Sequence, residues 1–440
     1  MATRNADLLI VHAAELLTCA GPVEGLRGEA LDRVEVLADG ALAVVDGRIE
    51  AVGTTEAILA GYDAPEVIDA TGRLVSPAFV DPHSHLLHGG SRHEEYDAKV
   101  TQRGDVRLDG GIRYTVRKTR EATDEQLVAR AQADLDTMLL HGTTTLEAKT
   151  GYGLDRDQEL RLLRLTASLR HAVDVVPTWL PLHVVPDGYR ERRGDYVAEM
   201  LAALPEAAKL ATYCDVSCDP LFFDFDECLK VGEAARALGM RIRVHADQNG
   251  DANGALLAAR LQATAADHLD YASDEGLRAM AAAGTVATLL PGVTLHMCEM
   301  TPRFEGDALG TAEKPFLPQL ARRAVAAGGT VALSTDYNPG SCPTPSMQMV
   351  MQLASRLFRL SYAQIWNMCT LNAARALDLS HDRGSLEKGK RADVLVWSVP
   401  AHGLAINRFG INQVDTVIAA GRVVVRHGHL LSSSTAGETR

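Results

Sequence analysis

The stretch Ala78-Phe-Val-Asp-Pro-His-Ser-His85 joins a short apolar run to two histidines that follow it directly. An apolar run of this length that ends at a proline is typical of a buried strand. The strand period of two places the imidazoles of His83 and His85 on one face, where both can bind a single metal ion at about 2.1 Å. Because two histidines in a polar loop would give the same pattern, the ends of the other strands have to decide its meaning.

Seven further apolar runs, separated by helical patterns, follow this one along the chain. Such alternation is typical of parallel βαβ units, and eight repeats that close on themselves form a (β/α)₈ TIM barrel. A capping box at Thr123-Asp-Glu-Gln126 predicts where one of the helices begins. The eight strands are expected at Ala78–Asp81, Thr143–Glu147, Val175–Pro181, Cys214–Ser217, Arg241–His245, Ala263–Asp267, Thr285–Leu290 and Thr330–Thr335.

The two ends of the chain share a different pattern, in which β-rich runs flank short turns. Asp46-Gly47 is a strong hairpin signal, and Val414–Val425 contains a second turn at Gly421-Arg422. Because these similar segments are distant in sequence, we expect one small β-sandwich domain built from both termini, with a frayed tail. The expected ranges are 1–75 and 391–440 for the β-sandwich domain, 76–390 for the barrel and 432–440 for the tail.

Composition and charge exclude several classes of protein. With 440 residues the chain exceeds the roughly 250–300 residues of a single core, which predicts a large domain and a smaller one. A net charge of −13 opposes binding to nucleic acid. The N-terminus lacks the pattern of an export signal, and no stretch approaches the ~20 apolar residues of a membrane span. We therefore expect a cytoplasmic protein with a small-molecule substrate and no nucleic-acid or membrane partner.

The cysteines support the same compartment. Seven of them, an odd number, do not suggest a small disulfide framework and suit reducing conditions. Cys214 and Cys218 could bind a metal, but they lie in an apolar, strand-like run and no second pair completes a tetrahedral site. We expect both to be buried structural residues.

Polar residues gather at the ends of the expected strands, where barrel enzymes place their catalytic groups. A closed barrel brings its first and eighth strands together, so the imidazoles and the carboxylate of these strand ends can form one site for Zn(II) or Fe(II/III). His268 is a fifth ligand, a core histidine or, as we favour, a residue that orients the metal-bound water. Asp336 would also accept a proton from that water. The four expected ligands are His83, His85, His245 and Asp336.

At these residues the chain resembles the amidohydrolase superfamily and, within it, the imidazolonepropionases of histidine catabolism. The resemblance covers nearly the whole chain, and two of its motifs, Lys149-Thr-Gly-Tyr-Gly-Leu154 and Thr335-Asp-Tyr-Asn-Pro-Gly-Ser341, are far more specific than the two histidines. The other matching runs are Phe79–His85, Gly110–Val116, Thr143–Ala148, His245–Gln248 and Asp267–Leu269.

The resemblance implies the same four metal ligands and adds residues that hold the substrate. Arg92, Tyr152 and His183 match substrate-binding residues, and Arg92 could pair with a propionate carboxylate. Asn338 would lie beside the metal aspartate. The alternatives without a role in the site are a surface cation for Arg92, an aromatic residue packed in a turn for Tyr152 and a core histidine for His183. The role of Lys149 stays open, and His88 and His93 are expected at the rim.

Two absences narrow the chemistry within this superfamily. Members with two metals need a bridging lysine, usually at the end of the fourth strand, and Cys214–Pro220 contains none, which favours one metal. Base deaminases carry a glutamate three residues after the histidine of the fifth strand, where this chain has Gln248. Since an amide cannot titrate, Gln248 is expected to hydrogen-bond rather than shuttle protons, and deamination is disfavoured.

The leading hypothesis is hydrolysis of a cyclic amide, with 4-imidazolone-5-propanoate opened to N-formimidoyl-L-glutamate, by a homodimeric enzyme. One departure concerns the substrate, because residues 101–109 lack the aromatic residue that relatives have there. A thio- or oxo-imidazolidine propionate is therefore an alternative substrate. A base deaminase and a non-catalytic binding module of the same fold are further alternatives.

Overall fold

Eight parallel strands form one sheet whose spatial order follows the chain, as the apolar runs predicted. The computed structural model describes residues 3–101, 110–299 and 317–431, so the expected tail and nearly all of the 101–109 segment lie outside the described residues. The strands are β10 (Phe79–Asp81), β11 (Thr143–Lys149), β12 (Asp174–Leu182), β13 (Tyr213–Cys218), β14 (Arg241–Ala246), β15 (Ala265–His268), β16 (Val286–Leu289) and β17 (Val331–Leu333).

The sheet closes into a barrel at the carboxyl ends of its first and last strands. The backbone N–H of His85 donates to the carbonyl oxygen of Tyr337 at 2.8 Å, and that of Asp336 donates to the carbonyl oxygen of His83 at 3.0 Å. The buried Asp81 carboxylate also accepts a hydrogen bond from the Thr335 hydroxyl at 2.6 Å. These contacts confirm that the histidine pair after β10 lies directly beside the segment that follows β17.

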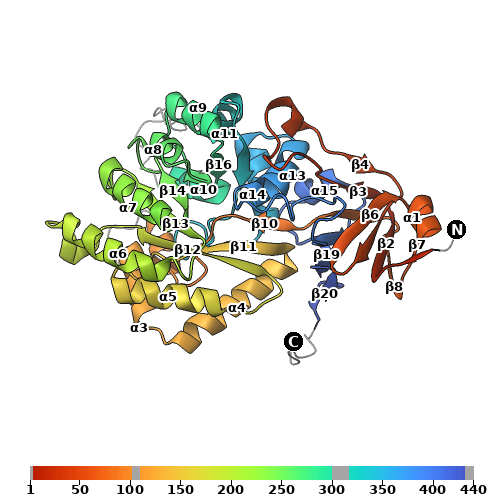
Figure 1. Cartoon of the computed structure of the whole chain (residues 1–440), viewed down its shortest axis with the longest axis horizontal. Helices are drawn as coiled ribbons and strands as arrows, with labels where there is room; N and C mark the ends of the chain where they lie inside the picture. The colour runs from red at the N-terminus through yellow and green to blue at the C-terminus, as the bar shows by residue number, and fades with distance from the viewer. Residues whose placement is uncertain (1–2, 102–109, 300–316, 432–440) are drawn as a thin grey trace.

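Helices cover the outside of the barrel (Figure 1), where α5 contacts β12, α7 contacts β13 and α8 contacts β14. The capping box is confirmed, since the Thr123 hydroxyl and the Gln126 side chain bond each other's backbone N–H groups at the start of α4. The helices are α1 (Thr55–Gly61), α2 (His93–Val100), α3 (Ile112–Glu121), α4 (Asp124–Leu140), α5 (Arg156–Ser168), α6 (Arg193–Ala207), α7 (Phe225–Ala237), α8 (Gly254–Arg260), α9 (Asp274–Ala283), α10 (Pro291–Glu299), α11 (Leu317–Ala326), α12 (Met347–Leu353), α13 (Tyr362–Cys369), α14 (Leu371–Arg375) and α15 (His402–Asn407).

Strands from both ends of the chain form two further sheets beside the barrel, at the right of Figure 1. One has the order β21-β20-β19-β18-β9-β3-β4 and the other β6-β5-β2-β8, and they share a core that includes Leu8, Leu42 and Val394. The expected β-sandwich is confirmed, whereas its boundaries stay a prediction. Its strands are β2 (Leu8–Ala13), β3 (Glu15–Leu17), β4 (Val36–Leu37), β5 (Gly40–Val45), β6 (Arg48–Thr54), β8 (Glu66–Asp69), β9 (Leu74–Pro77), β18 (Val394–Trp397), β19 (Val414–Ala419), β20 (Arg422–Arg426) and β21 (His429–Leu430), and β1 (Arg4–Asn5) pairs with β7 (Tyr62–Asp63) nearby.

The second expected hairpin turn lies one residue earlier than the sequence suggested. Ala419 pairs with Arg422, so the two turn residues are Ala420 and Gly421, and Arg422 already belongs to the strand. Both turn residues have positive φ, 48° and 76°, as a two-residue hairpin that follows the twist of its strands requires. The first hairpin, at Asp46-Gly47 between β5 and β6, is where the sequence placed it.

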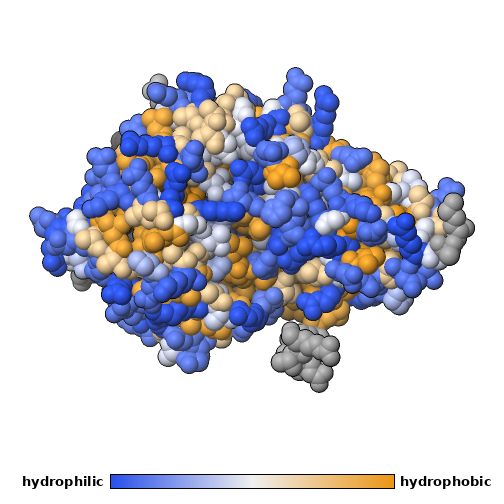
Figure 2. Space-filling view, viewed as in Figure 1, coloured by the Kyte–Doolittle hydropathy of each residue, from blue (hydrophilic) through white to orange (hydrophobic). Residues whose placement is uncertain are grey.

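The surface view of one face shows hydrophilic residues interspersed with hydrophobic ones (Figure 2). Among the described residues, no helix combines the length and apolar character that crossing a membrane would require. Six of the seven cysteines have side chains that the structure describes, and these six are free and buried, Cys214 and Cys218 among them, which agrees with a structural role for that pair.

Candidate active site

The four residues expected to bind metal meet at the carboxyl end of the closed barrel. The Nε2 atoms of His83 and His85 lie 3.3 Å and 3.5 Å from one carboxylate oxygen, Oδ1 of Asp336. The ring of His245, from β14, lies with its centroid 4.6 Å from that of His83. All four side chains are nearly or fully buried, with at most 7% exposure. Tertiary structure thus joins three strand ends that are far apart in the sequence.

The contacts of the three imidazoles indicate which ring nitrogen faces the centre. Nδ1 of His83 lies 2.8 Å from Oδ2 of Asp267, and Nδ1 of His245 lies 3.1 Å from Oδ2 of Asp215. Nδ1 of His85 faces the carbonyl oxygen of Thr150 at 3.4 Å. Because these oxygens only accept, the hydrogen bonds place the ring proton of His83 and of His85 on Nδ1 and leave the lone pair on Nε2. Burial lowers the pKa of His83 and of His85 well below 6.5, so both rings are neutral, the form that binds a metal.

Three buried polar atoms at the centre fit a divalent cation. Nε2 of His83, Nε2 of His245 and Oδ1 of Asp336 are buried, and no described residue offers any of them a hydrogen-bond partner. Leaving such atoms unpaired inside a protein is costly, and a cation facing all of them would supply the missing partner. Imidazole and carboxylate donors together suit zinc or iron.

His268 and Asp336 approach each other through unusual backbone conformations. Their φ angles are 73° and 48°, in the left-handed region that few residues other than glycine adopt. Such strain is a feature of functional sites held in place by their surroundings. Nε2 of His268 lies 4.0 Å from Oδ2 of Asp336, whereas the other carboxylate oxygen, Oδ1, lies nearest His83 and His85.

Tyr152 and His183 line the same centre from the loops after β11 and β12. The rings of His85 and His183 are stacked, with centroids 5.0 Å apart, and Tyr152 lies 5.4 Å from His85. Nδ1 of His183 donates to the carbonyl oxygen of Gly151 at 2.9 Å, which leaves Nε2 as an acceptor. Burial lowers the pKa of His183 to about 3, so its ring stays neutral. A Cβ on Gly151 would lie 2.7 Å from that Nδ1, so this contact needs glycine.

Asn338 and Gln248 lie in loops held by local hydrogen bonds. The side chain of Asn338 donates to the carbonyl oxygen of Asp336 at 2.7 Å and accepts from the N–H groups of Gly340 and Ser341, so it shapes the loop after β17. Gln248 is half-buried in the loop after β14. That loop is anchored by the neighbouring Asp247, whose carboxylate accepts three backbone N–H bonds at the start of α8.

Beneath the expected ligands lies a network of buried charges that the sequence analysis missed. Nζ of Lys149 lies 2.8 Å from Glu147, 2.7 Å from Asp215 and 3.4 Å from Asp267, all with 0% side-chain exposure. Arg243 adds a 2.9 Å bond to Asp267. Burial opposes the charge of Lys149, but Asp215 and Glu147 raise its pKa above 10.5, so it is an ammonium. Asp215 and Asp267 in turn hold two of the imidazoles.

A signal for this network was present in the sequence. Glu147 and Lys149 are two residues apart in β11, and Arg243 and His245 are two residues apart in β14, so each pair shares one face of an apolar strand. A charged side chain in such a strand is tolerated only when it is paired. Charged residues at inward positions therefore indicate that each has an oppositely charged partner inside the barrel. The spacing alone does not say which residue that partner is.

His88 is not a rim residue, which corrects the expectation, whereas His93 is exposed. The side chain of His88 is buried, with 1% exposure, because Nδ1 turns back to donate to the carbonyl oxygen of His85 at 2.9 Å. His88 thus supports the segment that carries the histidine pair.

The burial of His88 predicts a pH effect on stability. Burial lowers its pKa from 6.5 to about 3. Below pH 6.5 the unfolded chain gains a proton there that the folded protein does not, so stability falls as pH falls. The variant His88→Asn keeps an N–H donor but does not titrate. Between about pH 7.5 and pH 5.5, we expect the free energy of unfolding of the parent to fall by about 1.4 kcal/mol more than that of the variant. Urea denaturation measures both values. Equal losses would contradict this assignment.

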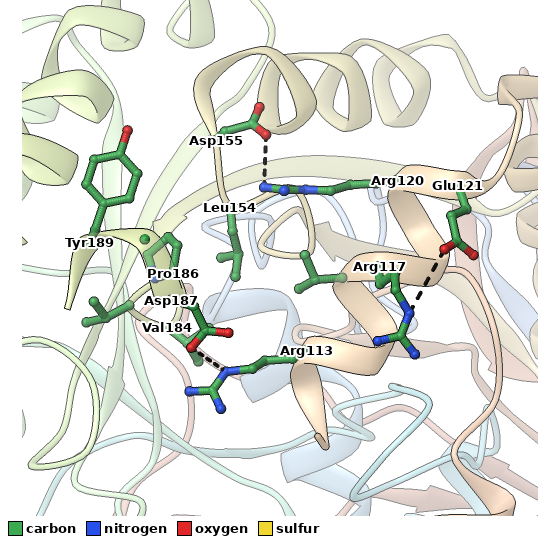
Figure 3. Close-up of a pocket in the computed structure, with 13 residues that line it drawn as sticks. Arg113, Arg117, Arg120, Glu121, Leu154, Asp155, Val184, Pro186, Asp187 and Tyr189 are labelled. Carbon is green, nitrogen blue, oxygen red and sulfur yellow. Dashed lines mark ion pairs between the residues drawn. The ribbon is translucent and has the colours of Figure 1, made fainter. Parts of the chain in front are cut away.

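A cavity of about 710 Å³ lies beside α3 and contains none of the expected ligands (Figure 3). Three arginines of α3 line it, and each has an acidic partner. Arg113 lies 3.1 Å from Asp187, Arg120 lies 2.9 Å from Asp155, and Arg117 lies 4.0 Å from Glu121. Because these charges are already compensated, the cavity gives no specific indication of a ligand.

Comparisons with known proteins agree with this geometry. Residues 74–424 match the sequence model of the amidohydrolase family. The imidazolonepropionase of Caldanaerobacter subterraneus is 40% identical over 94% of this chain and 97% of its own length. That of Symbiobacterium thermophilum is 42% identical over 97% and 99%.

Solved structures share the fold at lower identity. An adenosine deaminase from Xanthomonas campestris with bound zinc has a TM-score of 0.69 at 18% identity, covering 99% of this chain and 96% of its own. A 5-methylcytosine deaminase from Klebsiella pneumoniae has a TM-score of 0.70 at 19% identity, covering 98% and 99%. The fold, the family match along most of the chain and the identity to curated relatives lead to one conclusion: this chain belongs to the amidohydrolase family, among the imidazolonepropionases.

Proposed function

We propose that the protein hydrolyses a cyclic amide with the help of one divalent metal ion, opening 4-imidazolone-5-propanoate to N-formimidoyl-L-glutamate in histidine degradation. The observation that carries this proposal is the meeting of three imidazoles and one carboxylate at the carboxyl end of the barrel. The chain that forms this centre matches imidazolonepropionases along nearly its whole length. In the reaction, water adds across the ring C–N bond, so the carbonyl carbon becomes a carboxylate and the nitrogen leaves with a proton.

The side chains divide the work as follows. His83, His85, His245 and Asp336 would hold the ion, Zn(II) or Fe(II/III), which when bound lowers the pKa of water and polarises a carbonyl group. Asp336 accepts a proton on a carboxylate oxygen and passes it towards the leaving nitrogen. His268, 4.0 Å from Asp336, orients the attacking water and stabilises the developing negative charge.

The remaining residues hold the substrate and exclude other chemistry. Arg92 pairs with the propionate carboxylate. His183 offers Nε2 as an acceptor to a ring N–H, and burial raises the pKa of Tyr152 well above 10, so its phenol stays protonated and can donate. Gln248 binds by hydrogen bonds and cannot shuttle a proton, which argues against base deamination.

Metal analysis combined with a substrate panel tests this proposal. We expect about one zinc or iron ion per chain and fast turnover of imidazolone propionate to formimidoyl-glutamate, with activity lost on chelation and restored by the native metal. The panel includes the thio- and oxo-imidazolidine propionates and purine and pyrimidine bases. Faster turnover of an analogue would change the substrate, and ammonia released from a base would indicate a deaminase. Absence of both metal and hydrolysis would indicate a binding module.

A further inference from the structure

Arg92, the residue expected to hold the substrate carboxylate, is itself held by a carboxylate. Its Nε and Nη2 donate to the two oxygens of Glu95 in α2, at 3.0 Å and 2.8 Å. The two side chains are only 18% and 10% exposed. Two parallel bonds of this kind fix the plane and the direction of a guanidinium group. Arg92 is therefore not a loose surface cation, which was one reading of its sequence position.

The other end of the guanidinium lies against Gly340, in the loop after β17. A Cβ on Gly340 would lie 2.0 Å from Nη1 of Arg92 and 2.7 Å from its Cζ. The backbone of Gly340 has no positive φ, so its conformation does not require glycine. A side chain at 340 and the observed position of the Arg92 guanidinium are therefore incompatible, and one of them has to shift. Asn338 sets the position of Gly340 by accepting its backbone N–H at 2.8 Å.

Among the described residues, only Glu95 accepts hydrogen bonds from Arg92, which leaves one edge of the guanidinium without a partner there. A guanidinium has five N–H donors in one plane, and Glu95 takes the one on Nε and one on Nη2. The edge formed by Nη1 and Nη2 is a second fork that matches a carboxylate. Arg92, Gly340 and Ser341 also line a cavity of about 460 Å³, which offers space for an acidic side chain.

We infer that Glu95 and Gly340 are positioning residues that hold Arg92 with its Nη1–Nη2 edge presented to the substrate carboxylate. The inference rests on the proposed function, since it assumes a substrate that carries an acidic side chain. It assigns selectivity for acids over neutral analogues to three residues from two segments, the start of α2 and the loop after β17. An alanine at 340 would force the guanidinium to shift from this position, and the three nearest atoms to its Cβ belong to Arg92 and Asn338 rather than to the expected metal ligands.

The test measures binding of a probe that cannot be hydrolysed, imidazole propionate, and of its amide, by calorimetry on the metal-loaded enzyme. We expect Gly340→Ala and Glu95→Gln each to weaken binding of the acid by about 10–100-fold, as loss of a charge-assisted contact does. Binding of the amide should change less than about 2-fold. Steady-state kinetics should show a raised KM with kcat and metal content retained.

Matched variants separate positioning from general damage. Gly194→Ala, where a Cβ meets nothing within 4 Å, and Glu94→Gln, on the exposed side of α2, should behave like the parent. In an Arg92→Ala background, Gly340→Ala should have almost no further effect, because coupled residues are not additive.

The possible failures are distinguishable. If the parent hydrolyses imidazolone propionate but Gly340→Ala binds the acid probe as tightly as the parent does, this inference is wrong and the proposed function stands. If Arg92→Ala leaves acid binding unchanged, the carboxylate binds elsewhere and the inference is again wrong. If the variants show the expected selectivity but the parent hydrolyses no cyclic amide, only the proposed function is overturned.

Discussion

Replacing Asp336 by asparagine is expected to lower kcat by at least about 10³-fold, the largest effect of any single conservative change in this protein. One oxygen of Asp336 faces the Nε2 atoms of His83 and His85, and the other faces His268. An asparagine keeps the shape but replaces one oxygen by an NH₂ group, which neither accepts a proton nor binds a cation. The measurement is kcat together with the metal content of the purified variant.

The metal content of this variant separates the two roles given to Asp336. Retained metal with lost turnover indicates that Asp336 acts mainly as a proton acceptor, whereas loss of both indicates a ligand. The matched control is Asp393→Asn, another buried carboxylate, which pairs with Arg391 at 3.0 Å in the β-sandwich and should leave kcat unchanged. An Asp336→Asn enzyme with more than about a tenth of the parental kcat would contradict both roles.

Replacing Lys149 by methionine is expected to lower the free energy of unfolding by about 3–5 kcal/mol, which is the usual cost of removing one partner of a buried ion pair. Methionine fills a similar volume but leaves Glu147, Asp215 and Asp267 with Arg243 as the nearby cation of the network. Because Asp215 and Asp267 hold the Nδ1 atoms of His245 and His83, the metal should also bind about 10–100-fold more weakly. Urea denaturation and chelator competition measure the two effects.

A surface lysine provides the comparison for this variant. Lys118 also forms a 2.8 Å ion pair, with Glu121, but its side chain is 39% exposed. Solvent screens such a pair, so Lys118→Met should leave the unfolding midpoint and the metal affinity unchanged. Lys149→Arg, which keeps a positive charge, should recover part of the lost metal affinity. If Lys149→Met is as harmless as Lys118→Met, the buried network does not support the metal centre.

Much of the barrel could be predicted because each strand carries a local signal. Apolar runs bounded by turn residues predicted all eight strands within a few residues, and the capping box at Thr123 marked the start of its helix. The expected ligands were found for the same reason, since position at a strand end is a local property and the fold rule then places such ends together.

The errors and omissions concern side-chain direction and strand pairing. His88 lies in a polar segment that predicted a rim position, yet a hydrogen bond to the carbonyl oxygen of His85 turns it inward. The second hairpin turn was displaced by one residue because strand pairing, rather than the Gly-Arg dipeptide, decides which residues are unpaired. Lys149 could not be assigned, since two of its partners, Asp215 and Asp267, come from other strands.

The amino-acid sequence by itself determined the number and order of the strands and the chemical identity of the groups at their ends. Only the tertiary structure decided which ring nitrogen of each histidine faces the centre and which edge of the Arg92 guanidinium can bind a carboxylate. The physical reason is that proton position and side-chain direction depend on partners that pack against them, and Asp267, the partner of His83, is 184 positions away in the chain. No local pattern carries that information, because it arises only when the barrel closes.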